Sequence, residues 1–363
     1  MLAISGTRPV RGRADLLKWY RLYESCSSLD DPDGPCPRRL DRVCDTRSSP
    51  VRGLLHGRRT FCGWWSEHSG DVDQVTQVAI TSRGPVTGGF LLELPRWDYP
   101  HVAFCSLVVA PEARHEGLGR ELLRLSARKA DAAGRSTLIF YSRDGSAADS
   151  FLRAIGARQA GPTDIRQILD FHATEPRTPV VPAGSPGGLG KYNLIYWNEY
   201  LDERYLDGMA RLLDAMADAP RPDTMAAEKW TPQRVQQYEA EMTGRGTGMM
   251  KVMAVHKAGE PAAFSEVVFD PALPNWGFQG ATVVLPSHRG RDLGFLVKSA
   301  LYGRIGEERP EATHISTTNN ATNRRIITLN ERLGFHPNAA FTPWEIQVND
   351  IIGNPGATQR PAE

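Results

Sequence analysis

The chain has 363 residues, of which 40% are hydrophobic and 23% are charged, and its formal net charge is +1. That length exceeds the usual size of one domain, so we expect two domains that each bury a core. A net charge so near zero provides no global field that would recruit nucleic acid or a membrane surface. No stretch is apolar over the length needed to span a bilayer, so the sequence predicts a cytoplasmic protein with no membrane association.

The cysteines argue against both a disulfide framework and a metal site. There are five of them, all in the first third of the chain, and a closed set of disulfides needs an even number. The first three have the spacing C-x9-C-x7-C, which fits no compact zinc site, so we expect reduced thiols and no metal. The sequence assigns no further role to Cys26, Cys36, Cys44 and Cys62.

The first half of the chain alternates strand and helix patterns. Residues 15–25 favour a short helix, followed by a loop rich in Asp, Pro, Ser and Cys. Beyond it, β-branched runs and apolar residues at helical spacing predict strands at 75–80, 88–94, 101–109, 136–141 and 165–171, and helices at 117–133 and 147–155. Residues 173–190 contain four prolines and four glycines without periodicity, which is typical of a linker.

The second half follows a similar order. Thr231 before Pro232 predicts a helix start, because Thr caps a helix and proline suits its first position. A later helix closes at Gly334, as an earlier one closes at Gly156. The remaining expected elements are strands at 192–197, 249–256, 262–269 and 314–318, and helices at 202–218 and 321–333.

Comparison of the chain with itself shows an internal repeat. The stretch 108–119 aligns with 283–294, and three residue types recur 175 positions apart: Pro111 with Pro286, Arg114 with Arg289, and Gly119 with Gly294. In both stretches a strand leads through a turn into a helix. Glycine and a basic residue at a helix start let backbone N–H groups and the helix dipole face a phosphate. The sequence therefore predicts two copies of one α/β unit, each with a candidate pyrophosphate cradle.

These residues resemble the GNAT acetyltransferase superfamily. The resemblance rests on a strand ending in Val-x-Pro, an Arg-x-x-Gly-x-Gly turn, and a last helix ending in Gly-Phe at Gly334-Phe335. The whole chain looks like the tandem-GNAT arrangement of actinobacterial proteins, to which mycothiol synthase also belongs. The resemblance implies an α/β fold with two tandem GNAT domains, each a mixed, splayed β-sheet flanked by helices. The expected boundaries are an N-terminal domain at 1–172, the linker at 173–190, a C-terminal domain at 191–350, and a disordered tail at 351–363.

The resemblance also implies that acyl-CoA, as acetyl-CoA or another acyl-CoA, wedges into the opening of a sheet. The strand ends would bind its pantetheine arm and the turns its pyrophosphate. The implied cofactor-binding residues are Val108, Val109, Arg114, Gly117, Leu118 and Gly119 in the first half, and Val283, Val284, Arg289, Gly290, Arg291, Gly294 and Asn323 in the second.

Each half departs from the family pattern. The first half has Gly145 where the family often has a cofactor-contacting Asn, and Leu152 where it often has a catalytic Tyr. The second half keeps Asn323 but has Asn330 at the Tyr position, and Asp292 replaces the first turn glycine. A carboxylate facing a pyrophosphate would be repelled, so we expect Asp292 to pair with a neighbouring arginine on the outer face.

Transfer of an acyl group to an amine needs a base for the amine and a donor for the departing thiolate. We predict Glu266 as the base, because a carboxylate among β-branched neighbours can have a raised pKa; the alternative is a solvated Glu on the polar face of an edge strand. Asn330 could donate a hydrogen bond to the thiolate but cannot supply a proton. The candidate acceptor pocket consists of Asp218, Trp276 and Gln279; an Asp that ends a helix before Ala-Pro is more commonly a turn residue, which is the alternative for Asp218.

The sequence therefore predicts an acyl-CoA-dependent N-acyltransferase, monomeric or homodimeric, with the second half as the active one. Direct transfer through a tetrahedral intermediate to the amine of a small molecule is expected. Two alternatives stay open. The first is an aminoacyl-tRNA-dependent transferase on a GNAT-like fold, against which the near-neutral charge counts. The second is a catalytically inactive acyl-CoA-binding protein, which the missing Tyr in both halves favours.

Overall fold

The computed structural model describes residues 4–9, 21–22, 26, 72–81, 86–95, 98–171, 189–221, 225–244, 246–271 and 273–353. The helix expected at 15–25, the linker and the tail fall mainly outside these residues. The chain divides into two compact units. Unit 1 comprises Met1–Asp164, Pro222–Ala226 and Ala340–Glu363, and unit 2 comprises Ile165–Arg221 and Ala227–Ala339.

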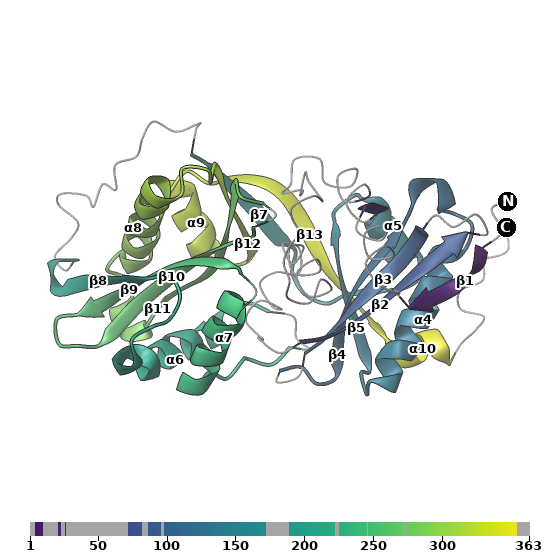
Figure 1. Ribbon diagram of the computed structural model, residues 1–363, viewed down its shortest axis with the longest axis horizontal. Coiled ribbons are helices and arrows are strands. Elements are labelled where there is room, and N and C mark those ends of the chain that lie inside the picture. Colours follow the sequence, from purple (N-terminus) through teal and green to yellow (C-terminus); the bar gives the residue numbers. More distant parts are fainter. Residues whose placement is uncertain are drawn as a thin grey trace. The chain divides into compact units, whose positions relative to one another are not determined.

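Unit 1 contains a mixed sheet with a long helix packed on one face (Figure 1). The strand order is β1 (Ile4–Pro9), β2 (Val72–Thr81), β3 (Val86–Pro95), β4 (Val102–Val109), β5 (Thr137–Arg143) and β13 (His336–Gln347), with β6 (Arg158–Gln159) paired to β13. Helix α4 (Leu118–Ala132) buries Leu118, Leu122 and Leu123 against β3 and β4, and packs against α10 (Val348–Ile352). Helix α5 (Ala147–Ala154) follows β5. The strands predicted at 75–80 and 88–94 and the helices predicted at 117–133 and 147–155 are thereby confirmed.

Unit 2 repeats this plan with helices on both faces (Figure 1). Its strand order is β7 (Asp164–Asp170), β12 (His314–Asn320), β11 (Trp276–Val284), β10 (Pro261–Phe269), β9 (Gly248–His256) and β8 (Tyr192–Trp197). Helices α6 (Leu206–Asp214) and α7 (Pro232–Gly244) cover one face, and α8 (Leu293–Glu308) and α9 (Arg324–Arg332) the other. The helix expected at 202–218 is α6 with a 3-10 turn at each end, Glu203–Tyr205 and Ala215–Asp218. Within the described part of the chain, no helix has the length and apolar character needed to cross a membrane.

The last strand of each half lies in the sheet of the other unit. Strand β7 comes from the first half of the sequence, yet it neighbours β12 in unit 2. Strand β13 comes from the second half, yet it pairs with β5 of unit 1, from Phe341↔Arg143 to Gln347↔Thr137. The expected boundaries at 172 and 191 keep each strand in its own half and miss this exchange. Local pattern identifies a strand but not the open sheet edge that satisfies its hydrogen bonds.

The central parallel pair of each sheet separates after three residue pairs. Strands β4 and β5 pair from Val102↔Thr137 to Phe104↔Ile139. Strands β11 and β12 pair from Trp276↔His314 to Phe278↔Ser316. Beyond these pairs the described strands diverge, so the predicted splayed sheets are confirmed in both units.

The two units differ in the strand that borders the opening. In unit 1, β3 and β4 keep one register from Gly88↔Val109 to Glu93↔Phe104. In unit 2, the register of β10 and β11 shifts between Ser265↔Thr282 and Val267↔Gln279. One residue of β10, Glu266, therefore lies opposite two residues of β11, which defines a β-bulge. The bulge begins just beyond the last β11–β12 pair.

Candidate functional site

The two turns after the splayed strands have the same construction. A 3-10 turn, Pro111–Ala113 in unit 1 and Pro286–His288 in unit 2, leads from strand to helix. Arg114 Nε donates to the Val109 carbonyl at 3.2 Å, and Arg289 Nε donates to the Val284 carbonyl at 3.0 Å. Each arginine thus fixes its turn to the end of the preceding strand, and the predicted equivalence of the two turns is confirmed.

No side chain caps the first N–H groups of α4 or α8. Gly117 precedes α4 with φ +87° and Asp292 precedes α8 with φ +58°, and neither forms a side-chain cap bond. A Cβ built on Gly117 or on Gly290 would meet nothing within 4 Å. Because the first N–H groups of a helix have no intrahelical partner, both starts can accept an anion.

The last glycine of each turn has a packing role. A Cβ on Gly119 would lie 3.3 Å from the Phe151 ring, and one on Gly294 would lie 2.9 Å from Leu329. These glycines let α4 and α8 approach the next helix of their unit. Leu118 is buried in the core, so only its backbone faces the turn. The cofactor contacts predicted for these positions can therefore come from backbone N–H groups alone.

Asp292 pairs with Arg332, 40 residues further along the chain. Its two carboxylate oxygens accept from Arg332 Nη1 at 2.8 Å and Nη2 at 2.7 Å. The hydrogen bond from Arg332 lowers the pKa of Asp292, so the carboxylate stays ionised and paired. The expected pairing of Asp292 with an arginine is confirmed, but the partner is Arg332 and not an arginine of the turn, because Arg289 pairs with Asp218 and Arg291 donates to the hydroxyl of Tyr192 at 3.0 Å.

The other predicted contact residues have local partners. The carboxylate of Asp218, predicted in the acceptor pocket, lies 2.6 Å from Arg289 Nη1. Trp276, predicted in the same pocket, stacks on His314 with ring centroids 4.7 Å apart. Asn323 is the N-cap of α9 and accepts from the Ile326 N–H at 3.4 Å. None of these contacts tests a ligand role, so those assignments stay predictions.

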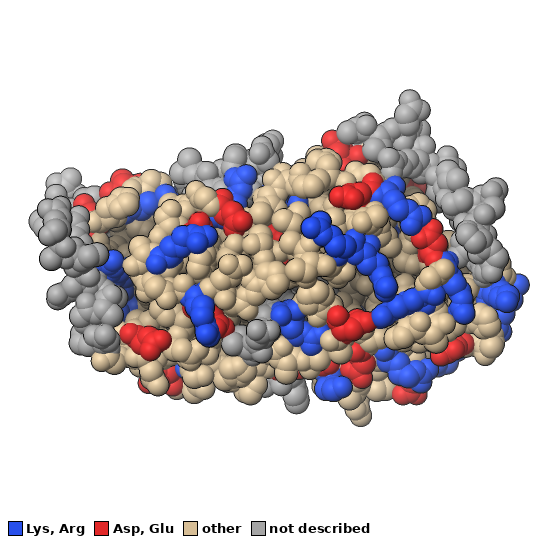
Figure 2. Space-filling model, turned by 180° about the vertical axis from the view of Figure 1, so that it is seen from behind, with Lys and Arg blue, Asp and Glu red and all other residues tan. Residues whose placement is uncertain are grey.

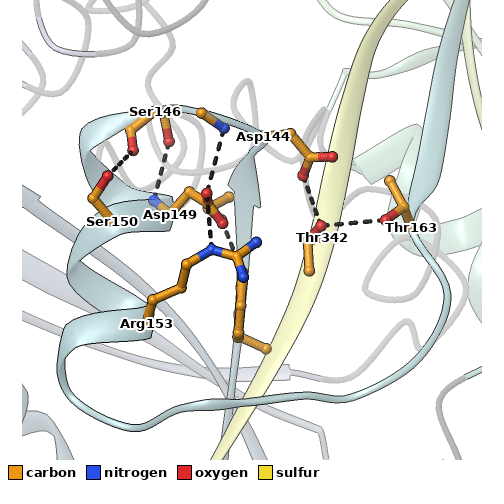
Figure 3. A network of polar contacts seen from close by, with 10 residues as sticks. Asp144, Ser146, Asp149, Ser150, Arg153, Thr163 and Thr342 are labelled. Atoms are coloured by element: carbon orange, nitrogen blue, oxygen red, sulfur yellow. Dashed lines mark hydrogen bonds and ion pairs between the residues drawn. The ribbon is translucent and has the colours of Figure 1, made fainter.

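In unit 1, the helix-capping position that Asn323 has in unit 2 lies one residue after Gly145. Ser146 is the N-cap of α5 and accepts from the Asp149 N–H at 3.2 Å. Gly145 precedes this cap, and its N–H donates to Asp149. Figure 3 shows this network beside the exchanged strand β13, where the Thr342 hydroxyl donates to Asp144 at 2.6 Å. Polar contacts around the start of α5 thus tie β13 into unit 1.

Glu266 lies buried at the bulge, on the face of the sheet that α6 and α7 cover. One carboxylate oxygen accepts from the Tyr238 hydroxyl at 3.4 Å and the other from the Ala281 N–H at 3.4 Å. A Cβ on Gly280 would lie 2.7 Å from the Glu266 side chain, so only glycine leaves room for it there. The alternative of a solvated Glu on an edge strand is wrong, because Glu266 is 2% exposed and β10 lies between β9 and β11.

A buried ion pair flanks Glu266 on the same face. Lys251 is the cross-strand partner of Glu266 on β9, and its Nζ lies 2.8 Å from a carboxylate oxygen of Glu239 on α7. Trp197 Nε1 donates to the same oxygen at 2.8 Å, and the Leu201 N–H donates to the other at 3.0 Å. Glu239 is thereby held by Lys251, Trp197 and the Leu201 N–H, whereas Glu266 lies at the bulge beside the opening.

On the opposite face, α8 and α9 contribute a second polar network. Gln279 lies inside the bulge and accepts from the Tyr302 hydroxyl. Asn330 is fully buried; its carbonyl accepts from Lys298 Nζ and its amide donates to Gln167 of β7 at 2.9 Å. Burial lowers the pKa of Lys298 to about 7. The thiolate contact predicted for Asn330 stays a prediction, and both groups of its side chain already have partners.

The same positions in unit 1 are apolar or weakly polar. The pairs Gly88↔Val109 and Ala263↔Val284 are equivalent, so counting along β3 and β10 aligns Leu91 with Glu266. One residue further along, Leu92 pairs with Cys105 and Val267 pairs with Gln279, which aligns Cys105 with Gln279. Counting from the first residue of α4 and α8 aligns Leu123 with Lys298 and Ala127 with Tyr302. The backbone carbonyls of Leu152 and Asn330 accept equivalent hydrogen bonds at the ends of α5 and α9, from the N–H groups of Ala157 and Phe335, each at 3.0 Å. These bonds align Leu152 with Asn330. Prediction from the sequence missed Lys298 and Tyr302, although their 175-residue alignment with Leu and Ala was a readable signal.

The two described cysteines are buried and form no disulfide. Cys26 and Cys105 are reduced and buried, and burial raises the pKa of Cys105 to about 12. Cys36, Cys44 and Cys62 lie outside the described residues. Among the residues that the structure describes, no three His, Cys, Asp or Glu side chains are grouped to hold a metal ion.

Comparison with known proteins identifies the fold. Residues 47–156 match the model of the Acetyltransferase (GNAT) family. The chain is similar to a tandem GNAT protein from the clavulanic acid biosynthesis pathway, with 24% identity, a TM-score of 0.72, and coverage of 94% of this chain and 98% of that one. It is also similar to a GCN5-related N-acetyltransferase from Sphaerobacter thermophilus, with 16% identity, a TM-score of 0.64, and coverage of 94% of this chain and 95% of that one. No curated protein sequence gives a significant match. The chain has the tandem GNAT fold, as its resemblance implied.

Proposed function

We propose that this chain, with a GNAT acetyltransferase match at residues 47–156 and the tandem GNAT fold, is an acyl-CoA-dependent N-acyltransferase whose reactive site lies in unit 2. One observation carries the choice of unit. Five positions around the opening of the sheet hold Glu266, Gln279, Lys298, Tyr302 and Asn330 in unit 2, and Leu91, Cys105, Leu123, Ala127 and Leu152 in unit 1. Burial of polar groups costs free energy unless they are hydrogen-bonded, and buried ionisable groups cluster at functional sites. Their concentration in one unit therefore favours chemistry there.

The residues of unit 2 fit an acyl-CoA. The start of α8 has no side-chain cap, and Arg332 holds the Asp292 carboxylate, so the helix N–H groups can face phosphate oxygens. The backbone of Val283 and Val284 borders the opening beyond the last β11–β12 pair and can bind an extended amide arm. Unit 1 offers the same strand end and a glycine at its turn, so we infer that acyl-CoA also binds there without reacting.

In the reaction, Glu266 acts as the base. Bound acyl-CoA supplies the activated acyl group. The amine must lose a proton before it can attack, and Glu266 takes that proton, directly or through a water. Tyr238 and the Ala281 N–H hold the carboxylate at the bulge. The face covered by α6 and α7 is therefore the proposed entry side for the acceptor.

We infer a small-molecule amine as the acceptor. Figure 2 shows Lys and Arg interleaved with Asp and Glu over the face that it displays, without a field of one sign among the coloured residues. The net charge of +1 agrees with this mixture. A nucleic acid or a strongly charged protein tail is recognised by an opposite field, which this face does not provide.

The test is release of CoA thiol from acetyl-CoA, with a panel of primary amines as acceptors. We expect amine-dependent thiol release by the full chain, with acylated amine found by mass spectrometry. Thiol release with no amine of the panel, together with tight acyl-CoA binding, would favour the binding-protein alternative. Transfer that requires charged tRNA and is abolished by ribonuclease would favour the aminoacyl-tRNA alternative.

A further inference from the structure

The amide of Gln279 occupies the centre of the β11 bulge. Its Nε2 lies 2.6 Å from the Glu266 carbonyl, 3.3 Å from the Gly280 carbonyl and 3.5 Å from the Ala281 carbonyl. The hydroxyls of Ser265 and Thr282 lie 3.1 and 3.2 Å from the same nitrogen. A primary amide has two N–H groups, so this nitrogen is placed among more acceptors than it can serve at once. It therefore bridges the two strands at the one place where their ladder is interrupted.

Tyr302 holds the other end of that amide. Its hydroxyl donates to Gln279 Oε1 from the third turn of α8, and the tyrosine is 6% exposed. Burial raises the pKa of Tyr302 well above its usual value, so the phenol keeps the proton that it donates. If the amide flipped, its carbonyl would face the carbonyl oxygens of the bulge, which accept hydrogen bonds and donate none. The bulge carbonyls thus select the orientation of the amide, and the Tyr302 hydroxyl anchors the amide in that orientation.

Unit 1 shows what the same strand does without this pair. Cys105 and Ala127 occupy the positions of Gln279 and Tyr302, and neither offers an amide or a phenol. The β3–β4 register there is unbroken, from Gly88↔Val109 to Glu93↔Phe104. The bulge and the Gln–Tyr pair are present together in one unit and absent together from the other, within the residues described.

We propose that Gln279 and Tyr302 are positioning residues that hold the bulge open, and that through it they set the Ala281 N–H against the Glu266 carboxylate. This inference rests on the proposed function of unit 2. A regular ladder would place a directly paired residue opposite Glu266, and a slip of one residue turns side chains to the other face of a sheet. Gly280, one of the two β11 residues opposite Glu266, leaves the space that the Glu266 side chain occupies.

The test compares Tyr302→Phe with Tyr196→Phe, a control on β8. A cation lies over each ring, Lys298 over Tyr302 and Arg304 over Tyr196. Loss of a buried hydrogen bond corresponds to about a tenfold change. In Tyr302→Phe we expect kcat for acyl transfer to fall about tenfold while the Kd for CoA stays within twofold, because the phosphate turn is unchanged.

Hydrogen exchange supplies a readout that does not depend on activity. We expect the Ala281 amide to exchange faster in Tyr302→Phe than in wild type or Tyr196→Phe, and faster still in Gln279→Leu. Unchanged kcat and unchanged Ala281 exchange in Tyr302→Phe would overturn the proposal, and so would losses in kcat and CoA affinity that merely follow a fall in Tm. If wild type transfers no acyl group, the proposed function fails; the Ala281 exchange rates then decide whether the pair holds the bulge.

Discussion

The two units of this protein keep one backbone plan and differ in what their interiors contain. Unit 1 has the phosphate turn with the family's glycine, Gly117, but apolar or weakly polar residues at the five positions around its opening and an unbroken β3–β4 ladder. Unit 2 carries an acid, Asp292, in the turn and holds it with Arg332, while its interior contains a bulge and two buried polar networks. The better phosphate turn therefore belongs to the unit with the poorer site for chemistry. Cofactor binding and acyl transfer are properties that can separate between duplicated units.

The acceptor side of the sheets differs in the same way. In unit 2, α6 and α7 cover this face and Glu266 lies beneath them. In unit 1, the corresponding face of β4 and β5 packs around Tyr99, Phe104 and Ile139, and Met225, from the segment Pro222–Ala226, completes that cluster. Leu91, the residue aligned with Glu266, replaces the carboxylate on β3 of unit 1.

The largest expected effect comes from the carboxylate that only unit 2 has at this position. Glu266→Gln should lower kcat/KM for amine acylation by about 10²- to 10³-fold near neutral pH, because the base is lost. The deficit should shrink as pH rises, since the amine then deprotonates unaided. The measurement is thiol release across a pH series. Glu93→Gln, at a buried glutamate on β3 of unit 1, is the matched control and should keep its rate. A deficit that does not change with pH would remove Glu266 as the base.

The second effect concerns the turn of unit 1. Gly117→Glu places a side chain in the left-handed region, at φ +87°, and a carboxylate at a helix start. We expect acyl-CoA binding in unit 1 to weaken about a hundredfold, so that calorimetry counts one site instead of two, while thiol release by unit 2 continues. Gly134→Glu is matched in strain, at φ +72° with the same open surroundings, and lies at the other end of α4. Two sites in both variants would show that unit 1 does not bind through this turn.

The third effect tests whether the pairing of Asp292 with Arg332 allows acyl-CoA to bind in unit 2. Arg332→Ala leaves Asp292 unpaired beside the start of α8, and repulsion should weaken acyl-CoA binding about tenfold in a Gly117→Glu background. The double variant Asp292→Gly/Arg332→Ala should restore it, because the glycine suits φ +58° and removes the charge. Arg304→Ala, which breaks an ion pair with Glu308 elsewhere on α8, serves as the control. Failure of the double variant to restore binding would mean that Arg332 acts on the ligand by itself.

Much of the fold was predictable from the sequence because it depends on local pattern. The repeat at Arg114 and Arg289 predicts the two turns, and helical spacing predicts α4 and α8. The exchange of β7 and β13 was not predictable, since a strand's pattern does not name its partner sheet. The partner of Asp292 lies on another helix, which no spacing rule connects to the turn. The bulge did leave a trace: Phe104 and Phe278 end the parallel pairing 174 residues apart, whereas the turns are 175 apart.

The smallest expected effect concerns the cost of keeping Lys298 in the core. Its neighbours are Asn330, the Tyr302 ring and the Phe335 ring, whose centroid lies 5.1 Å from Nζ. Burial lowers the pKa of Lys298 from 10.5 to about 7. Between these values the unfolded chain binds a proton that the folded chain does not, so stability should rise with pH from about 7 toward 10.5.

The double variant Lys298→Leu/Asn330→Leu gives unit 2 the residues of unit 1 at both positions. We expect the slope of stability against pH in this range to flatten, with no loss of stability near pH 7, because well-packed apolar residues replace a buried charge at little or no cost. Urea unfolding at a series of pH values measures this, and Lys257→Leu, at an exposed lysine in the turn after β9, should keep the wild-type slope. An unchanged slope in the double variant would mean that Lys298 stays charged in the fold. Unit 2 would then differ from unit 1 by a buried cation as well as by its hydrogen bonds.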